Sequence, residues 1–243
     1  MKHQYFGDIS DYKKYSILRR ISDNGKLRTM VAWMLTPNDQ RNEGNINKYL
    51  DDPDLWRQFE PDIFDSLRKA VVVNKTKDLR IVERKKLVSG AGYFWDTLSD
   101  NLIDRKRYFK KLQETAKDYE VVFLDPDNGI ATRSMTKGRK NSSKYVFWDE
   151  ISDLWNKGHS ILIYQHFPRV NRMEYIKRKV EEINNQLQNS ETYAIRTTYM
   201  VYFLIPREKH SLHFKDLKEK IEGRWGENIG VEYYHKLFVV DSQ

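Results

Sequence analysis

The chain has 243 residues, of which 39% are apolar, 32% are charged and 13% are aromatic, and it has no cysteine. This composition is typical of a globular protein and excludes a disordered or fibrous chain. The lack of cysteine excludes disulfides, thiolate metal sites and cysteine nucleophiles. No run approaches the roughly 18 consecutive apolar residues of a membrane span, and the first residues are too polar for a secretory signal. We therefore expect a cytoplasmic protein that does not enter a membrane.

The charge balance is basic, with 43 Lys and Arg against 35 Asp and Glu and a formal net charge of +8. A basic balance favours polyanionic partners, because each neutralised phosphate releases counterions. The basic residues cluster with Tyr and Phe between them, as stacking on bases requires, although any single cluster is also typical of a solvated helix face. We expect binding to RNA or DNA. The expected phosphate contacts are Arg105, Lys106, Arg107, Lys140 and Arg169.

The first half of the chain mixes helices with short apolar strands. Asp8 or Ser10 caps a predicted helix that runs to about residue 24 and precedes a buried strand over 27–35. A helical pattern over 53–69 comes before β-rich pieces at 70–73 and 79–87. A helix over 102–116 then leads into the clearest strand, 120–124.

The second half alternates strands and helices. The predicted strands are 145–148, 160–164, a strand region over 193–205, and 231–240. The predicted helices are 149–156, 171–189 and 211–224. Strands that alternate with helices of roughly 10–15 residues predict βαβ units. We expect one α/β domain over residues 1–243, of the Rossmann-like type, with a mostly parallel central sheet.

Polar side chains follow two of the predicted strands, where open α/β sheets bind their ligands. Asp125-Pro126-Asp127-Asn128-Gly129 follows strand 120–124. Asp125 can accept a hydrogen bond from a substrate amine or share a metal with Asp127, and an Asx turn is the alternative interpretation. Both interpretations agree that the turn is sharp.

His166 and Arg169 follow the strand at 160–164. His166 is a candidate general base or substrate-orienting group, and Arg169 is a candidate phosphate ligand. The alternative is a hydrogen-bonded His at a strand end and a solvated Arg. The loop over 137–144, which contains Lys140, offers further donors to a phosphodiester backbone, and Glu150 either adds a carboxylate or caps a helix.

Two short segments together resemble the motifs of one enzyme family. Gly7-Asp8-Ile9-Ser10-Asp11-Tyr12-Lys13-Lys14-Tyr15 resembles the G-N-x-x-D-x-x-K-H opening of a bacterial large-subunit ribosomal RNA adenine-N6 methyltransferase family. Asp125-Pro126-Asp127-Asn128 resembles the D-P-P-Y tetrad that amino-methyltransferases use to hold the exocyclic nitrogen. The order of elements after the tetrad is also similar.

The resemblance implies a class I methyltransferase-like fold and S-adenosylmethionine as cofactor. It implies that Asp125 accepts from the target amine, that the backbone of Pro126 positions this amine, and that Lys14 and Tyr15 lie near the base. Glu83 is the candidate carboxylate for the cofactor ribose. The chain has Asn128 where the family has an aromatic residue, and its first strand ends in 34–37 (Met-Leu-Thr-Pro) without a Gly-rich turn.

Three functions remain open from the sequence. The first is an adenine-N6 methyltransferase-like enzyme that acts on RNA or DNA, with Asp125, Asp127, Asn128 and His166 as its catalytic candidates. In the second, Asp125, Asp127 and Glu150 hold Mg²⁺ and His166 assists hydrolysis of a phosphodiester, as in a nuclease. The third is a domain without a cofactor that only binds nucleic acid.

Overall fold

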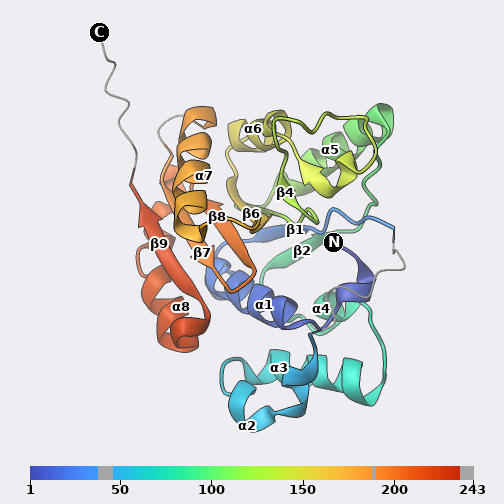
Figure 1. Ribbon diagram of the computed structural model, residues 1–243, viewed down its shortest axis with the longest axis vertical. Coiled ribbons are helices and arrows are strands. Elements are labelled where there is room, and N and C mark those ends of the chain that lie inside the picture. The colour runs from blue at the N-terminus through green and yellow to red at the C-terminus, as the bar shows by residue number, and fades with distance from the viewer. Residues whose placement is uncertain (38–45, 188–189, 236–243) are drawn as a thin grey trace.

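The computed structural model describes residues 1–37, 46–187 and 190–235. Within these residues the centre of the molecule is a seven-stranded sheet with the order β2-β1-β3-β6-β8-β7-β9 (Figure 1). The sheet therefore joins segments from the whole length of the chain. Its strands are β1 (Thr29–Ala32), β2 (Ala91–Phe94), β3 (Val121–Leu124), β6 (Ser160–His166), β7 (Thr192–Arg196), β8 (Met200–Ile205) and β9 (Gly230–Tyr234).

One half of the sheet is parallel and the other half is antiparallel. β2, β1, β3 and β6 pair in parallel, whereas β8 runs antiparallel to β6 and β7, and β9 runs antiparallel to β7. A smaller sheet pairs β4 (Gly129–Ile130) with β5 (Tyr145–Val146). The protein is thus a mixed α/β structure, as the alternating pattern predicts.

Helices cover both faces of the large sheet (Figure 1). Four of the helices in the described part of the chain, α1, α2, α5 and α7, begin after a polar side chain that accepts from the first backbone N–H groups, as Asn101 does for α5 and Asn171 for α7. None of the helices within the described residues is long and apolar enough to cross a bilayer. The helices are α1 (Ile9–Ile21), α2 (Pro53–Trp56), α3 (Pro61–Arg68), α4 (Arg80–Arg84), α5 (Leu102–Ala116), α6 (Trp148–Asn156), α7 (Arg172–Gln186) and α8 (Leu217–Trp225).

Alternation along the strands builds one apolar core on each face. Val31 and Phe123 pack into a core with apolar residues of α1, α3 and α8. Their neighbours Ala32 and Leu124 pack into a second core with α5, α6 and α7. Parallel strands need both faces covered, and the fully apolar sequences of β1 and β3 follow from this arrangement.

The predictions for the strongest elements are confirmed. The predicted strands 120–124 and 160–164 are neighbours in one sheet, with Val121 opposite Ser160, and the helix predicted over 102–116 has those bounds. The strand predicted over 145–148 is the short β5 of the smaller sheet. The strand predicted over 231–240 is present as β9, and residues 236–240 lie outside the described residues.

Three predictions of secondary structure are wrong. The β-rich piece at 70–73 is a π-helical turn, Lys69–Val73, because it continues α3, and Val73 is 63% exposed. The piece at 79–87 contains the short helix α4. The strand region over 193–205 is a hairpin, because the N–H of Thr197 donates to the carbonyl of Met200 and turns the chain back. The sheet is consequently less parallel than expected.

The order of the strands fixes where a ligand can approach. The chain goes from β1 to β2 on one side and then crosses to β3 on the other side of β1. The connections that leave β1 and β3 thus diverge at their carboxyl ends. Such a topological switch point is where open α/β sheets form their binding crevice.

Candidate functional site

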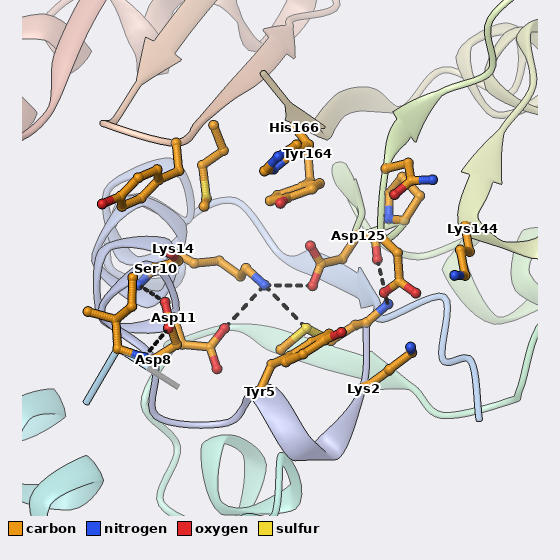
Figure 2. Close-up of a pocket in the computed structure, with 17 residues that line it drawn as sticks. Lys2, Tyr5, Asp8, Ser10, Asp11, Lys14, Asp125, Lys144, Tyr164 and His166 are labelled. Carbon is orange, nitrogen blue, oxygen red and sulfur yellow. Dashed lines mark hydrogen bonds and ion pairs between the residues drawn. The ribbon is translucent and has the colours of Figure 1, made fainter. Parts of the chain in front are cut away.

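A pocket of about 330 Å³ opens at this edge of the sheet, between the carboxyl ends of β3 and β6 and the start of α1 (Figure 2). Its volume lies in the range of small-ligand sites. Its wall contains acidic, basic and aromatic side chains from segments that are far apart in the sequence. The lining includes Lys2, Tyr5, Asp8, Ser10, Asp11, Lys14, Asp125, Pro126, Asp127, Asn128, Lys144, Tyr164, His166 and Tyr199.

A buried lysine joins the two motifs at the centre of this pocket. Lys14 Nζ lies 2.8 Å from Asp125 Oδ2 and 3.3 Å from Asp11 Oδ1. Figure 2 shows the lysine side chain reaching across from α1 toward Asp125, with Asp11 on its other side. All three side chains are buried. The opening segment and the tetrad are therefore one structural unit, although Lys14 and Asp125 are 111 residues apart in the chain.

The start of α1 is shaped by its own acidic residues. Asp8 caps the helix by accepting from Ser10 N at 2.8 Å, and its second oxygen accepts from Ile46 N at 2.8 Å. Asp11 Oδ2 accepts from Gly7 N at 3.2 Å. These bonds fix the first turn of the helix, so that Asp11 and Lys14, one turn apart, face the same pocket.

The turn after β3 is held in shape by a glycine and a buried glutamine. Gly129 has a φ of +107°, and a Cβ at this position would lie 2.4 Å from the Gln165 side chain. Gln165 Oε1 accepts from Ile130 N at 2.9 Å, and its Nε2 donates to the carbonyl of Asn128 at 3.0 Å. Only glycine fits such a position without strain, so Gly129 and Gln165 position the tetrad.

The first residue of the chain fills the crevice between β1 and β3. The amino-terminal nitrogen of Met1 lies 2.7 Å from Asp127 Oδ1, and it donates to the carbonyls of Met34 at 3.3 Å and Asp125 at 3.2 Å. Thr36 Oγ1 donates to the other oxygen of Asp127 at 2.9 Å. The carboxylate of Asp127 thus already pairs with the ammonium group of Met1 and accepts a hydrogen bond from the hydroxyl group of Thr36.

Burial and the neighbouring charges shift the pKa of each of these groups in opposite directions. Burial raises the pKa of Asp11 to about 6, although Lys14 lowers it. Burial alone would lower the pKa of Lys14, but the carboxylates of Asp125 and Asp11 outweigh it and hold that pKa above its usual value. Burial likewise raises the pKa of Asp127, and the ammonium group of Met1 outweighs it, so that pKa is lowered. Lys14 stays charged, and Asp11 changes charge near pH 6.

Five of the sequence-predicted residues line this pocket together: Lys14, Asp125, Asp127, Asn128 and His166. Among the described residues, Asp125 Oδ1 has no hydrogen-bond partner, because Lys14 binds only Oδ2. Asp125 thus offers one acceptor oxygen to a ligand.

Other predicted residues lie elsewhere. Tyr15 is fully buried and packs edge-on against Trp33, so it does not line the pocket. Glu83 is exposed on the short helix α4, where it accepts from Trp95 Nε1 at 2.9 Å. Lys140 and Arg169 are exposed and lie outside the pocket wall.

The expected phosphate contact at Arg105 is wrong. Arg105 is 2% exposed and forms a bidentate ion pair with Glu150, with Nε 2.6 Å from Oε1 and Nη2 2.8 Å from Oε2. It also donates to the carbonyls of Ser142 and Tyr145. A guanidinium with all these partners joins α5, the loop before β5 and α6. Lys106 and Arg107, by contrast, are exposed.

Several residues of the pocket carry no sequence signal that predicts them. In the sequence, Tyr164 is the last residue of the apolar segment 160–164 and therefore resembles a core residue. In the structure, burial and the nearby Asp125 raise the pKa of its hydroxyl well above the usual value. Lys144 and Tyr199 come from loops. The position of Lys144 follows from the β4–β5 pairing, in which Asn128 N donates to the carbonyl of Lys144 at 2.9 Å.

The magnesium ligands proposed from the sequence do not come together. Within the described part of the chain, no group of three His, Asp or Glu side chains is arranged to hold a metal ion. Asp125 binds Lys14, Asp127 binds the nitrogen of Met1, and Glu150 binds Arg105.

The residues that the resemblance assigns to S-adenosylmethionine already have partners in this structure. The position between the carbonyls of Met34 and Asp125 is taken by the nitrogen of Met1. Glu83, the candidate for the ribose, is engaged with Trp95 on α4. The part of the pocket wall that Met1 does not contact includes Tyr164 and His166, which lie above Lys14 in the view of Figure 2.

No family model matches the chain, and no curated protein sequence matches it. A crystal structure of a Legionella pneumophila protein described by the family model DUF519 is similar to this structure, with a TM-score of 0.46 and 10% sequence identity. The match covers 95% of this chain and 98% of that chain.

Proposed function

We propose that this protein binds RNA or DNA through a methyltransferase-like fold and holds the exocyclic amino group of one nucleobase at Asp125. The observation that supports this function most directly is the contact between Lys14 and Asp125, 2.8 Å long. It brings together the two segments that separately resemble motifs of the adenine-N6 methyltransferase family.

The chemistry of Asp125 suits an amine. Lys14 Nζ donates to Oδ2 at 2.8 Å, and Oδ1 is left to accept from a ligand. A carboxylate oxygen accepts hydrogen bonds, so Oδ1 favours a donor such as the amino group of adenine over a carbonyl. Tyr164 and Tyr199 supply aromatic surface in the same pocket, which is the surface on which bases stack.

Base recognition of this kind does not require the crevice that Met1 fills. It uses side chains that line the open part of the pocket, and the net charge of +8 favours the polynucleotide that carries the base. Methylation of the bound amine is the finer proposal from the resemblance. It would require the segment before α1 to leave the crevice, so cofactor binding is a separate measurement from base binding.

The test compares two nucleosides that differ at one group. Adenosine carries an amino group where inosine carries a carbonyl, and calorimetry or NMR titration measures both. We expect adenosine to bind at least about tenfold more tightly, because a buried acceptor facing a carbonyl loses a hydrogen bond and keeps the desolvation cost. Equal affinities for the two nucleosides in the wild-type protein would overturn the proposal.

A matched variant locates the preference. Asp125→Asn keeps the shape of the side chain but can turn its amide to donate to a carbonyl. We expect it to lose the preference for adenosine, with circular dichroism as the check of folding. Lys110→Gln, an exposed position on α5, is the control and should keep the preference. S-adenosylmethionine titrated into the same wild-type sample tests the finer proposal independently.

A further inference from the structure

A second and larger cavity adjoins the candidate site. It has a volume of about 910 Å³ and lies between the β4–β5 pair, the end of β6 and α7. Asn128 and His166 line both cavities, so a ligand in the first pocket continues into the second past these two side chains. We call this second cavity the α7 groove.

The α7 groove has unpaired positive charge. Arg133 and Arg178 line it, both are exposed, and neither forms an ion pair with a carboxylate of the described residues. Lys179 and Glu182 also line it but neutralise each other at 2.6 Å. The remaining acidic residue of the wall is Glu181. An arginine without a partner keeps its full donor set for an anion, and its planar fork suits phosphate.

Aromatic side chains stand in the same wall. Trp148 and Tyr175 are half-buried and line the α7 groove. Trp148 is fixed in place because its Nε1 donates to Glu182 Oε1 at 2.8 Å, and Glu182 is in turn held by Lys179. Tyr175 packs edge-on against Phe167, with ring centroids 6.0 Å apart. Rings held in this way present apolar surface at little entropic cost.

The wall also carries amide groups in quantity. Asn128, Asn185 and Gln186 line the α7 groove. Amides donate and accept, so they can bond to base edges and sugar hydroxyls. Together with the two arginines, these amides add polar groups and a weakly basic charge to a wall that also has apolar surface. An apolar protein segment would leave these groups without partners.

We propose that the α7 groove binds the nucleotide next to the base held at Asp125, on the same single strand of RNA or DNA. In this arrangement Arg133 and Arg178 bind its phosphates, Trp148 or Tyr175 stacks on its base, and the strand passes over Asn128 and His166. This inference rests on the proposed function, because it takes the base at Asp125 as its starting point.

The test compares the affinity of the protein for a single strand with its affinity for a free nucleoside. The probes are adenosine and a six-nucleotide oligoadenylate, the latter as RNA and as DNA, each titrated into the whole chain at several salt concentrations. In the wild-type protein the hexamer should bind more tightly than adenosine. In Arg133→Gln/Arg178→Gln, this advantage should fall tenfold or more, and the log–log salt slope should decrease by about 1.4, because each phosphate contact on a single strand contributes about 0.7. The control is Lys110→Gln/Lys215→Gln, which removes two exposed charges elsewhere and should keep the advantage.

The outcomes separate the two proposals. If adenosine binds with the expected preference over inosine and the arginine variant keeps the whole advantage of the hexamer, the α7 groove is not the neighbouring subsite and the base site stands. If neither hexamer nor adenosine binds the wild-type protein, the proposed function fails and this inference fails with it. A second signal checks the location: the indole N–H resonance of Trp148, assigned with Trp148→Phe, should shift on addition of hexamer but not of adenosine.

Discussion

Lys14 is the residue on which the candidate site depends, because it is buried and its one ammonium group contacts two carboxylates. Its nitrogen lies within 3.3 Å of both Asp11 and Asp125. A buried ion pair contributes little to stability when compared with apolar residues, but removal of one partner leaves an uncompensated charge. The contribution of the ion pairs to stability is therefore small, but removal of Lys14 would be costly because it would leave two buried carboxylates without a cation.

Replacement of Lys14 should be far more costly than replacement of its neighbour. Lys14→Met leaves Asp11 and Asp125 buried without their cation, and we expect a loss of about 3–5 kcal/mol in the free energy of unfolding. Lys13→Met is the matched control, because Lys13 is also buried but donates only to the carbonyl of Asn228 at 3.3 Å, so its loss should be about 1 kcal/mol. Urea denaturation measures both, and equal losses would contradict the assigned role of Lys14.

The stability should also depend on pH through Asp11. Its pKa is about 6 in the folded protein against an ordinary value of 3.8, so the folded state binds the proton more tightly than the unfolded chain. This contribution is complete below pH 3.8 and is lost as the pH rises through 6. Asp11→Asn should lack this loss, so the variant should gain stability relative to the wild type between pH 4 and pH 7, by up to about 3 kcal/mol. A difference that stays constant across this range would contradict the assigned pKa.

Some residues of the site could be predicted from the sequence and others could not. Lys14 and Asp125 lie in short motifs with charged or turn-forming residues at fixed spacing, so each could be identified alone. Their mutual contact depends on the long-range pairing of β1 with β3. The partner of Arg105 could not be found, because nothing in a run of basic residues tells a buried guanidinium from an exposed one. Burial at that position is decided by Glu150, in a distant helix.

The turn between β3 and β4 is the element that fixes the tetrad, and two glycines provide a matched test of it. Gly129→Ala places a Cβ against Gln165 at a positive φ, so we expect a loss of about 1–3 kcal/mol in stability together with weaker adenosine binding. Gly223→Ala in α8 meets no atom within 4 Å and should stabilise the protein by about 0.5–1 kcal/mol. Thermal unfolding of the two variants decides whether the glutamine contact matters.

The ion pair between α5 and α6 gives a second contrast at this scale. Arg105→Gln should cost about 2–3 kcal/mol, because Glu150 stays buried with only the Lys137 ammonium, 3.2 Å from its Oε1, as a cation, yet it should leave the affinity for the oligoadenylate unchanged. Lys106→Gln, at the next position and exposed, should change stability by less than about 0.5 kcal/mol. Denaturation and oligonucleotide titration on both variants test this, and weaker binding by folded Arg105→Gln would restore the arginine as a phosphate contact.

At the scale of the elements, sequence periodicity predicted correctly whether the strongest segments are helices or strands. It did not predict well how consecutive elements are connected. The helix over 102–116 and the strand over 120–124 have strong patterns and clear ends, and both are confirmed. The hairpin of β7 and β8 was read as one strand region because its turn, 197–199, has no glycine or proline to mark it. The π-helical turn after α3 was read as a strand because three consecutive valines favour β structure locally, whereas packing of α3 decides the outcome.

At the scale of the whole molecule, the positive charge is spread over exposed loops. Lys140 and Arg169 are both exposed and outside the two cavities, so we expect their contribution to the proposed nucleic-acid binding to be long-range attraction. We expect Lys140→Gln/Arg169→Gln to weaken oligoadenylate binding at low salt and to change it little at high salt, where the Debye length is short. A loss of affinity that is the same at all salt concentrations would indicate direct contacts instead.

The mixed direction of the sheet has a consequence for the order in which the chain folds. In the parallel half, residue 29 pairs with residues 91 and 121, so these strands meet only after long loops close. In the antiparallel half, β7 and β8 are joined by a three-residue turn and form a local hairpin. The chain loses the entropy of loop closure before the distant contacts stabilise it, so the local hairpin can form early. It can then serve as a template on which β6 and afterwards the other parallel strands assemble. The ligand pocket, which needs both halves, is then among the last parts of the protein to form.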